Sequence, residues 1–285
     1  MFRQTGLLRA LRPLAAVMVV ASLSGILLAV DDPGKNKEED ARREEQSQRV
    51  QRSAAQYTVS PAGDRKQPFK FHQDAVMKWS NPVGGAKDGA IYIWSDRHRP
   101  QAIFKLFSHD GEHFTHEWQS LAEGAIVAER DGTAVWNPTE PGITFRTIPD
   151  APKPAEASDA RLRQMKSLAG KFSVTATRLP RDAKPTNLRL LVRPLLRFET
   201  GDGMQGPDGT LFGFAEGTDP VALLLIEARR TEDGDRWHYA FARMTSWAVT
   251  AMYGEQEVYS VGKYDFSRDA KGTFLVLSRQ PVPKE

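Results

Sequence analysis

From Tyr57 onward, short apolar stretches alternate with clusters of Gly, Pro, Asn and Asp. Segments of this length, bounded by turn residues, are typical of β-strands joined in antiparallel order. The predicted strands are 69–79, 89–95, 101–107, 113–119, 124–129, 143–148, 188–198, 210–215, 221–229, 236–247, 256–264 and 273–278. The sequence therefore predicts a mainly β fold of the β-rich α+β type.

Two of these strands carry more specific patterns. Segment 221–229 is apolar at both odd and even positions, which predicts cover on both faces of the sheet. Segment 188–198 alternates apolar residues with arginines, but Pro194 cannot donate a hydrogen bond to a neighbouring strand. We therefore expect 188–198 to be an edge strand or to contain a bulge.

One segment has a helical pattern. Ser158 can cap the amino end, Met165 and Leu168 lie on one face, and Gly170 can end the helix. The sequence predicts a covering helix at 158–169.

The chain contains an internal repeat. Asp88–Trp94 lies 120 residues before Asp208–Phe214, and the Gly, Pro and Ala landmarks of the two segments have the same spacing, while an Asp-Gly turn closes each segment. The landmarks are Gly89 and Gly209, Pro100 and Pro220, Ala102 and Ala222, and the Asp-Gly turns at 110–111 and 233–234. An unrelated pair of meanders would share the order of strands and turns, but the spacing favours a duplication. Because each copy has one apolar face, we expect the copies to form a barrel or sandwich.

The amino-terminal part differs from the rest. Three arginines in residues 1–12 precede the uncharged run Pro13–Val30, a pattern that predicts a signal peptide at 1–30. A membrane anchor is the alternative if the segment is not cleaved. Residues 31–56 are rich in charge at helical i,i+4 spacing and almost without an apolar face. They predict a solvated spacer or loose helix.

The remaining chain divides into two parts. Residues 57–150 are expected to form the first β meander, and 151–285 the helix and the second meander, within one compact domain.

Composition excludes several classes of protein. Residues 1–30 contain three of the 39 Lys and Arg and none of the 36 Asp and Glu, so the remainder is formally balanced. A balanced chain does not indicate nucleic-acid binding, which needs a basic surface. The absence of Cys excludes disulfides, thiolate metal ligands and a lipid-modified cysteine.

The histidine-rich stretch SHDGEHFTHEW (108–118) raises the question of a metal site. Asp-Gly after an apolar strand predicts a hairpin, and strand alternation then separates His113 from His116. Only His109 and His113, which flank the turn, can meet, and they form the alternative metal site. The glycine pattern at 201–206 is followed by a strand and not by the helix that a dinucleotide site requires. We expect no metal and no cofactor.

The candidate ligand-binding residues are polar groups within the apolar strands of the second meander. They are Glu216, Asp219, Glu227, His238, Tyr239 and Arg243. Burial of such groups is unfavourable unless they are paired, and Glu227 with Arg243 is the predicted pair. The structural interpretation is a polar network that fixes the core. The functional interpretation is a pocket at the seam between the copies, with Trp237 and Trp247 as apolar walls. No catalytic residue is identified.

Several segments resemble a family of exported planctomycete proteins of unknown function. They are WSNPVGG (79–85), DGAIYIWSDRHRPQAIFKLF (88–107), GTAVWNPTEPGITFRTIPDAP (132–152), RLRQMKSLA (161–169) and LFGFAEGTDPVALLLIEAR (211–229). The resemblance covers most of 57–250. It implies a periplasmic or cell-envelope location, with no activity, cofactor or functional residue attached.

Together these observations predict a non-catalytic exported protein that binds an envelope protein or a small ligand between two β-rich halves. The membrane is expected to be a partner only through an uncleaved amino-terminal segment. A hydrolase acting on cell-envelope polymers is one alternative, and a surface scaffold without a pocket is another. The sequence favours a role other than catalysis.

Overall fold

The structure is a computed structural model that describes residues 33–81, 85–178, 184–199, 208–266 and 269–281. The predicted signal segment and the glycine pattern at 201–206 lie outside these residues. The chain divides into two compact units, Met1–Asp40 and Ala41–Glu285, and helix α1 (Pro33–Ala55) runs from the first into the second.

The second unit contains two repeats with the same order of elements. The first repeat (residues 41–136) comprises the end of α1, β1 (Tyr57–Pro61), β2 (Lys70–Phe71), β3 (Met77–Asn81), β4 (Ala86–Asp96), β5 (Arg99–Ser108), β6 (His113–Ser120), β7 (Ile126–Arg130) and β8 (Thr133–Trp136). The second repeat (residues 158–261) comprises α2 (Ser158–Ala169), β10 (Phe172–Thr177), β11 (Thr186–Leu190), β12 (Leu196–Phe198), β13 (Asp208–Glu216), β14 (Asp219–Thr231), β15 (Gly234–Arg243), β16 (Ala248–Tyr253) and β17 (Gln256–Val261). Each repeat is followed by one more strand, β9 (Arg146–Thr147) or β18 (Phe274–Pro281).

Strand pairing is nearly the same in the two repeats, except that β10 also pairs with β11, whereas β1, β7 and β8 form a separate sheet. In both, the first strand pairs with the seventh, the seventh with the eighth, and the second to the sixth form an antiparallel group around the fourth. One irregularity also recurs: the register shifts after Trp94 in the first repeat and after Phe214 in the second. The predicted duplication is therefore correct, and it extends beyond the meander to a helix and the outer strands.

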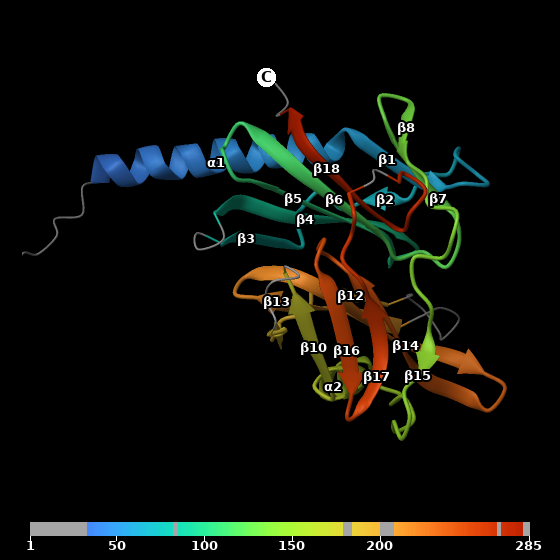
Figure 1. The fold of residues 1–285 in the computed structure, drawn as a ribbon. Helices are drawn as coiled ribbons and strands as arrows, with labels where there is room; N and C mark the ends of the chain where they lie inside the picture. The colour runs from blue at the N-terminus through green and yellow to red at the C-terminus, as the bar shows by residue number, and fades with distance from the viewer. Residues whose placement is uncertain (1–32, 82–84, 179–183, 200–207, 267–268, 282–285) are drawn as a thin grey trace, which may run out of the picture. The chain divides into compact units, whose positions relative to one another are not determined.

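The last strand of each repeat pairs with the sheet of the other. Strand β9 follows the first repeat but pairs with β15, with His238 opposite Thr147. Strand β18 follows the second repeat but pairs with β6, with Leu275 opposite Trp118 (Figure 1). This reciprocal exchange of strands joins the repeats through main-chain hydrogen bonds.

The central sheets pack face to face through an apolar seam. One sheet has the order β18-β6-β5-β4-β2, with β3 beside β4, and the other has the order β17-β16-β10-β11-β13-β14-β15-β9, with β12 beside β13. The buried residues of the seam are Ile91, Ile93, Ile103, Leu121, Ile143, Leu195, Leu211, Leu223, Leu225, Ala240, Ala242 and Met244. Face-to-face packing of this kind is a β-sandwich, while the longer sheet curls into a half-barrel, so the predicted mainly β fold is confirmed.

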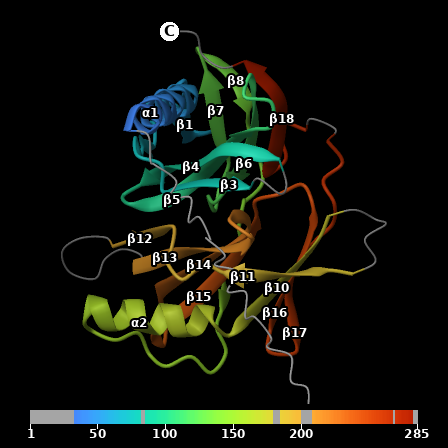
Figure 2. The ribbon, with the colours of Figure 1, turned by 90° about the vertical axis from the view of Figure 1, so that its left-hand side faces the viewer.

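The opposite face of each central sheet is covered by its own repeat. Helix α2 lies against β13 and β14 and buries Met165 and Leu168 there (Figure 2). The double cover predicted for 221–229 is correct, because Leu223 and Leu225 face the seam while Leu224 and Ile226 join the α2 core. Burial on both faces explains the continuous apolar run.

The residues expected to form a solvated spacer include the end of α1, whose last turns pack on the first sheet. Val50 and Ala54 are buried in the core of the first repeat. Ser53 Oγ lies 3.2 Å from His116 Nε2, and Tyr57 Oη lies 2.9 Å from His116 Nδ1. These three apolar or small residues, at i, i+3 and i+4 spacing, were too few to predict this burial from the pattern.

Some element boundaries differ from the predicted ones. Segments 69–79 and 188–198 each contain two short strands, and the second break includes Pro194 as expected. Segment 236–247 ends at Arg243, where its main chain turns into β16. Strands β1, β8, β10 and β16 lack long apolar runs and were not predicted.

In each repeat, a glycine at the equivalent position allows an aromatic ring to pack directly against the main chain. A Cβ at Gly89 would lie 2.2 Å from Trp79 Cε2, and one at Gly209 would lie 2.4 Å from Phe198 Cζ.

Gly89→Ala is therefore expected to lower the free energy of unfolding by about 1–3 kcal/mol. Gly63→Ala is the control, because nothing lies within 4 Å of its Cβ. Equal urea midpoints for the two variants would contradict the ring packing.

Burial, with a smaller contribution from the Arg130 charge, lowers the pKa of His116 to about 3. An unfolded histidine has a pKa of about 6.5, so unfolding takes up a proton between these values. The free energy of unfolding should therefore fall as the pH drops below about 6.5, by up to about 1.4 kcal/mol per pH unit. Urea unfolding at about pH 7 and about pH 5 measures this slope. In His116→Gln the part of the slope that comes from this imidazole should vanish, and an unchanged slope would contradict the assignment.

Candidate functional site

Arg99 and Glu227 form an ion pair between the repeats at one end of the seam. Arg99 begins β5, Glu227 lies in β14, and Arg99 Nε is 2.8 Å from Glu227 Oε1. The Glu227 side chain is 0 % exposed and that of Arg99 is 10 % exposed. Burial raises the pKa of Glu227, while the Arg99 and Arg229 charges act to lower it. The carboxylate is thus buried against guanidinium groups and has no access to solvent.

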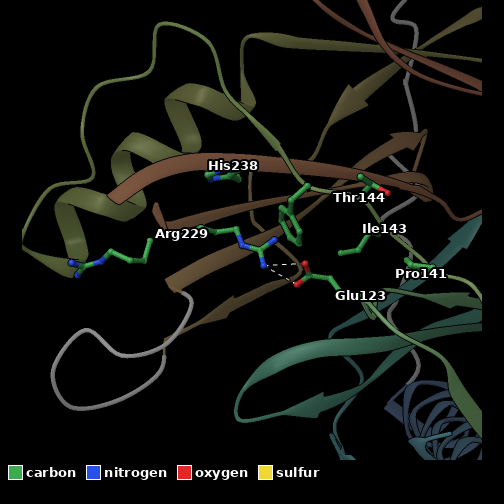
Figure 3. A pocket seen from close by; sticks show the side chains of 8 residues that line it. Glu123, Pro141, Ile143, Thr144, Arg229 and His238 are labelled. Carbon is green, nitrogen blue, oxygen red and sulfur yellow. Dashed lines mark hydrogen bonds and ion pairs between the residues drawn. The ribbon is translucent and has the colours of Figure 1, made fainter. Parts of the chain in front are cut away.

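A pocket opens beside this ion pair. Its volume is about 410 Å³, and its lining residues come from the loop after β6, the loop before β9, and strands β14 and β15. They are Glu123, Pro141, Ile143, Thr144, Phe145, Arg229, Arg230 and His238 (Figure 3). Both repeats and the segment that leads to the exchanged strand β9 therefore contribute to its wall.

Two arginines, Arg229 in the pocket wall and Arg99 behind it, converge on one ring and one carboxylate of this pocket. The guanidinium carbon of Arg229 lies 4.2 Å from the ring centroid of Phe145, and that of Arg99 lies 5.4 Å from it. Arg229 Nη2 donates to both oxygens of Glu123, at 2.9 and 3.0 Å (Figure 3). Arg99 Nη2 lies 3.4 Å from Glu123 Oε1. The arrangement is suited to holding a carboxylate beside an apolar surface.

Both ring nitrogens of His238 have partners. Nδ1 lies 3.2 Å from the carbonyl oxygen of Arg236, which can only accept, so Nδ1 carries the proton. Nε2 then accepts from the Thr147 hydroxyl at 3.1 Å. Burial lowers the pKa of His238, and the Arg236 carbonyl acts in the opposite direction. This imidazole is neutral and held in place.

A second buried charge cluster lies where β5 meets the start of β14. Lys105 Nζ lies 2.7 Å from Glu117 and 3.1 Å from Asp219, and it donates to the Met244 carbonyl oxygen at 2.8 Å. Burial alone would lower the pKa of Lys105, but the Asp219 and Glu117 carboxylates outweigh it and raise the pKa. The ammonium group therefore stays charged within the seam.

The two clusters are related by the repeat. Arg99 and Asp219 both begin the fifth strand of their repeat, and each pairs with a charged residue on the fifth strand of the other repeat. The signs are inverted: Arg99 meets Glu227, whereas Asp219 meets Lys105. The equivalent positions Arg99 and Asp219 thus carry opposite charges, while their partners Glu227 and Lys105 do not occupy equivalent positions. The two ends of the seam are therefore chemically different.

The structure brings only part of the predicted set together. His238 lines the pocket, Glu227 is buried behind it, and Asp219 belongs to the Lys105 cluster. Glu216 lies at the turn opposite Asp219, and Tyr239 packs against Phe172 and Phe241 in the α2 core.

The predicted pair of Glu227 with Arg243 is wrong. Glu227 lies opposite His238 and Arg243 opposite Ala222, so the two side chains are several positions apart along the sheet. Arg243 donates to the carbonyl oxygens of Thr245 and Trp247 and lies over the Phe274 ring. The predicted apolar walls are also wrong, because Trp237 and Trp247 belong to the α2 core.

The site residues that sequence reasoning missed are Arg99, Glu123, Phe145 and Arg229. They come from four separate segments, and no local pattern links them. One feature of the sequence pointed to Arg99: it occupies the position equivalent to Asp219, which was included in the predicted set. Comparison of the copies position by position would have brought Arg99 into that set.

The histidine-rich hairpin forms a turn rather than a cluster of ligands. Asp110 accepts from the main chain of Glu112 and His113, and its Oδ2 lies 3.0 Å from His113 Nδ1. These hydrogen bonds lower the pKa of Asp110. His109 instead contacts the Phe107 ring. In the described part of the chain no three His, Asp or Glu side chains are grouped to hold a metal.

Comparison with known proteins finds no matching family model, no matching curated protein and no matching solved structure. Among the residues that the structure describes, no helix has the length and apolar character needed to cross a membrane. The resemblance to an exported planctomycete family remains a prediction.

Arg99→Met should lower the free energy of unfolding by about 3–5 kcal/mol, because it leaves the Glu227 carboxylate buried without its nearest partner. The control is Arg236→Met, which removes an exposed ion pair with Asp233 and should have little effect. The double variant Arg99→Met/Glu227→Met should recover most of the loss. Urea unfolding curves measure all three, and similar midpoints for Arg99→Met and Arg236→Met would contradict a stabilising pair.

Proposed function

We propose that this protein is a non-catalytic binding module whose ligand is a small molecule held in the pocket between the repeats. The observation that supports this proposal is the pocket itself, with a volume of about 410 Å³. Small-molecule sites have volumes of about 300–1,000 Å³ and combine apolar walls with a few polar groups. Pro141, Ile143 and Phe145 supply the apolar wall here, and Arg229 and His238 supply polar groups.

The chemistry of the lining favours binding over hydrolysis. A hydrolase needs a carboxylate or imidazole that can reach substrate and exchange a proton. Glu227 has a raised pKa but is enclosed, the His238 nitrogens are both engaged, and Glu123 is in an ion pair. None of the eight lining residues pairs a nucleophile with a free base. A hydrolytic role for this pocket therefore has less support.

Export to the periplasm or cell envelope is part of the same proposal. It rests on the basic residues of 1–12 and the uncharged run that follows them.

The test is a screen of small acids, bases and neutral aromatic compounds by ¹H–¹⁵N NMR. Binding should shift the amides of Ile143, Thr144, Phe145 and His238. Thr144→Trp, at an exposed position of the rim, should fill the pocket and weaken binding by about tenfold or more. Thr133→Trp, also exposed but on β8, is the matched control and should bind normally. Absence of shifts at the pocket, or equal binding by both variants, would contradict the proposal.

A further inference from the structure

We infer that the pocket recognises a carboxylate group and that the Glu123 side chain occupies the position of that group in the ligand-free protein. This inference rests on the proposed function and names the chemical class of the ligand. A ligand carboxylate would replace Glu123 between Arg99 and Arg229, while its apolar body would lie against the wall formed by Pro141, Ile143 and Phe145.

The contacts of Glu123 are those that a bound carboxylate would make. Its two oxygens accept from Arg229 Nη2 at 2.9 and 3.0 Å, and Oε1 lies 3.4 Å from Arg99 Nη2. One carboxylate thus bridges two guanidinium groups that come from different repeats. The Arg99 Nη2 atom is buried and has no hydrogen-bond partner of good geometry, so a better-placed oxygen would improve its environment.

The two arginines are held by other contacts. Arg99 donates to Glu227 through Nε at 2.8 Å and lies close to the Leu121 carbonyl oxygen, at 3.4 Å from Nη1. Arg229 lies on the Phe145 ring, with its Nε 4.0 Å from Glu227 Oε2. These contacts do not involve Glu123. The guanidinium pair therefore keeps its geometry when Glu123 moves away, and the site is preorganised.

Glu123 is the member of the group that can leave. Its side chain is 45 % exposed, against 10 % for Arg99 and 30 % for Arg229. It belongs to the short connection between β6 and β7, which lies outside both strands. An exposed ion pair contributes little free energy because water solvates the separated charges. Rotation of Glu123 into solvent therefore costs less free energy than separation of the buried Arg99–Glu227 pair would.

Charge balance selects the class of ligand. Arg99 and Arg229 are neutralised by Glu227 and Glu123, and Arg230 pairs with Asp235 at 2.7 Å. When Glu123 swings out, one positive charge remains in a partly desolvated place. A monocarboxylate restores neutrality, whereas a neutral compound leaves Arg229 without a counter-ion and a cation adds repulsion.

The equivalent end of the seam lacks these features. The main-chain nitrogens of Leu121 and Met244 make equivalent hydrogen bonds to Gln101 and Val221, so the residue equivalent to Glu123 is Ser246. At that end of the seam, the fully buried Lys105 side chain pairs with Asp219 and Glu117. The duplicated fold therefore carries the arginine pair and its exposed carboxylate at one end.

The test uses the full chain and two matched probes, sodium phenylacetate and neutral phenylacetamide, in calorimetric and ¹H–¹⁵N NMR titrations. The unaltered protein should bind phenylacetate more tightly than phenylacetamide. Glu123→Gln removes the competing carboxylate and should bind phenylacetate about fivefold more tightly. Arg229→Gln should bind it about tenfold more weakly, or not measurably. Neither substitution should change the affinity for phenylacetamide by more than about twofold.

Two surface variants distinguish an effect of the pocket residues on binding from an effect of the protein's net charge. Asp233→Asn and Arg236→Gln make the same charge changes at an exposed ion pair outside the pocket and should leave phenylacetate binding unaltered. Thermal unfolding confirms that each variant is folded before its titration.

The outcomes distinguish the two proposals. If phenylacetamide binds in the pocket as tightly as phenylacetate, or Glu123→Gln behaves like Asp233→Asn, the carboxylate inference is overturned and the binding pocket stands. If no probe and no compound of the wider screen shifts the pocket amides, both proposals fail.

Discussion

The apolar seam between the two central sheets is the interaction on which the rest of the structure depends. Each repeat builds a sheet with two apolar faces, and its own helix and outer strands cover only one of them. The second face has to be buried against the other repeat, because burial of apolar area is the main favourable term in folding. The exchanged strands β9 and β18 complete the arrangement, since each repeat lends its last strand to the sheet of its neighbour. Neither repeat therefore has a finished sheet of its own.

The seam also determines where charge can lie. Its centre is aliphatic, and two charged pairs enter it, Arg99 with Glu227 and Lys105 with Asp219. Arg99 and Asp219 begin the equivalent strands β5 and β14, and their partners lie further along the strand of the other repeat. Desolvation makes each of these groups dependent on a partner from the other repeat. One end is filled by Lys105. At the other end the arginines face the loop that carries Glu123 and the segment that leads into β9, and a pocket remains. The proposed site is thus a consequence of duplication followed by divergence.

Much of this fold could be predicted from the sequence. The paired Gly, Pro and Ala landmarks marked strands that do have the same register in both repeats, and the apolar run 221–229 indicated burial on two faces. The outer strands and the docking of α1 could not be predicted, because a few small residues such as Ala54 carry no distinctive periodicity. The site was only partly predicted. Glu227 and His238 were visible as polar residues in apolar strands, whereas Glu123 and Phe145 lie in loops whose positions depend on tertiary contacts.

The reciprocal exchange of β9 and β18 is what joins the two repeats, and nuclear Overhauser contacts between main-chain protons reveal which strands are neighbours. We expect contacts between Thr147 and His238 and between Leu275 and Trp118 in the same molecule. Contacts that instead place β9 beside β6 and β18 beside β15 would mean that each repeat completes its own sheet. The seam and the pocket built on it would then be wrong.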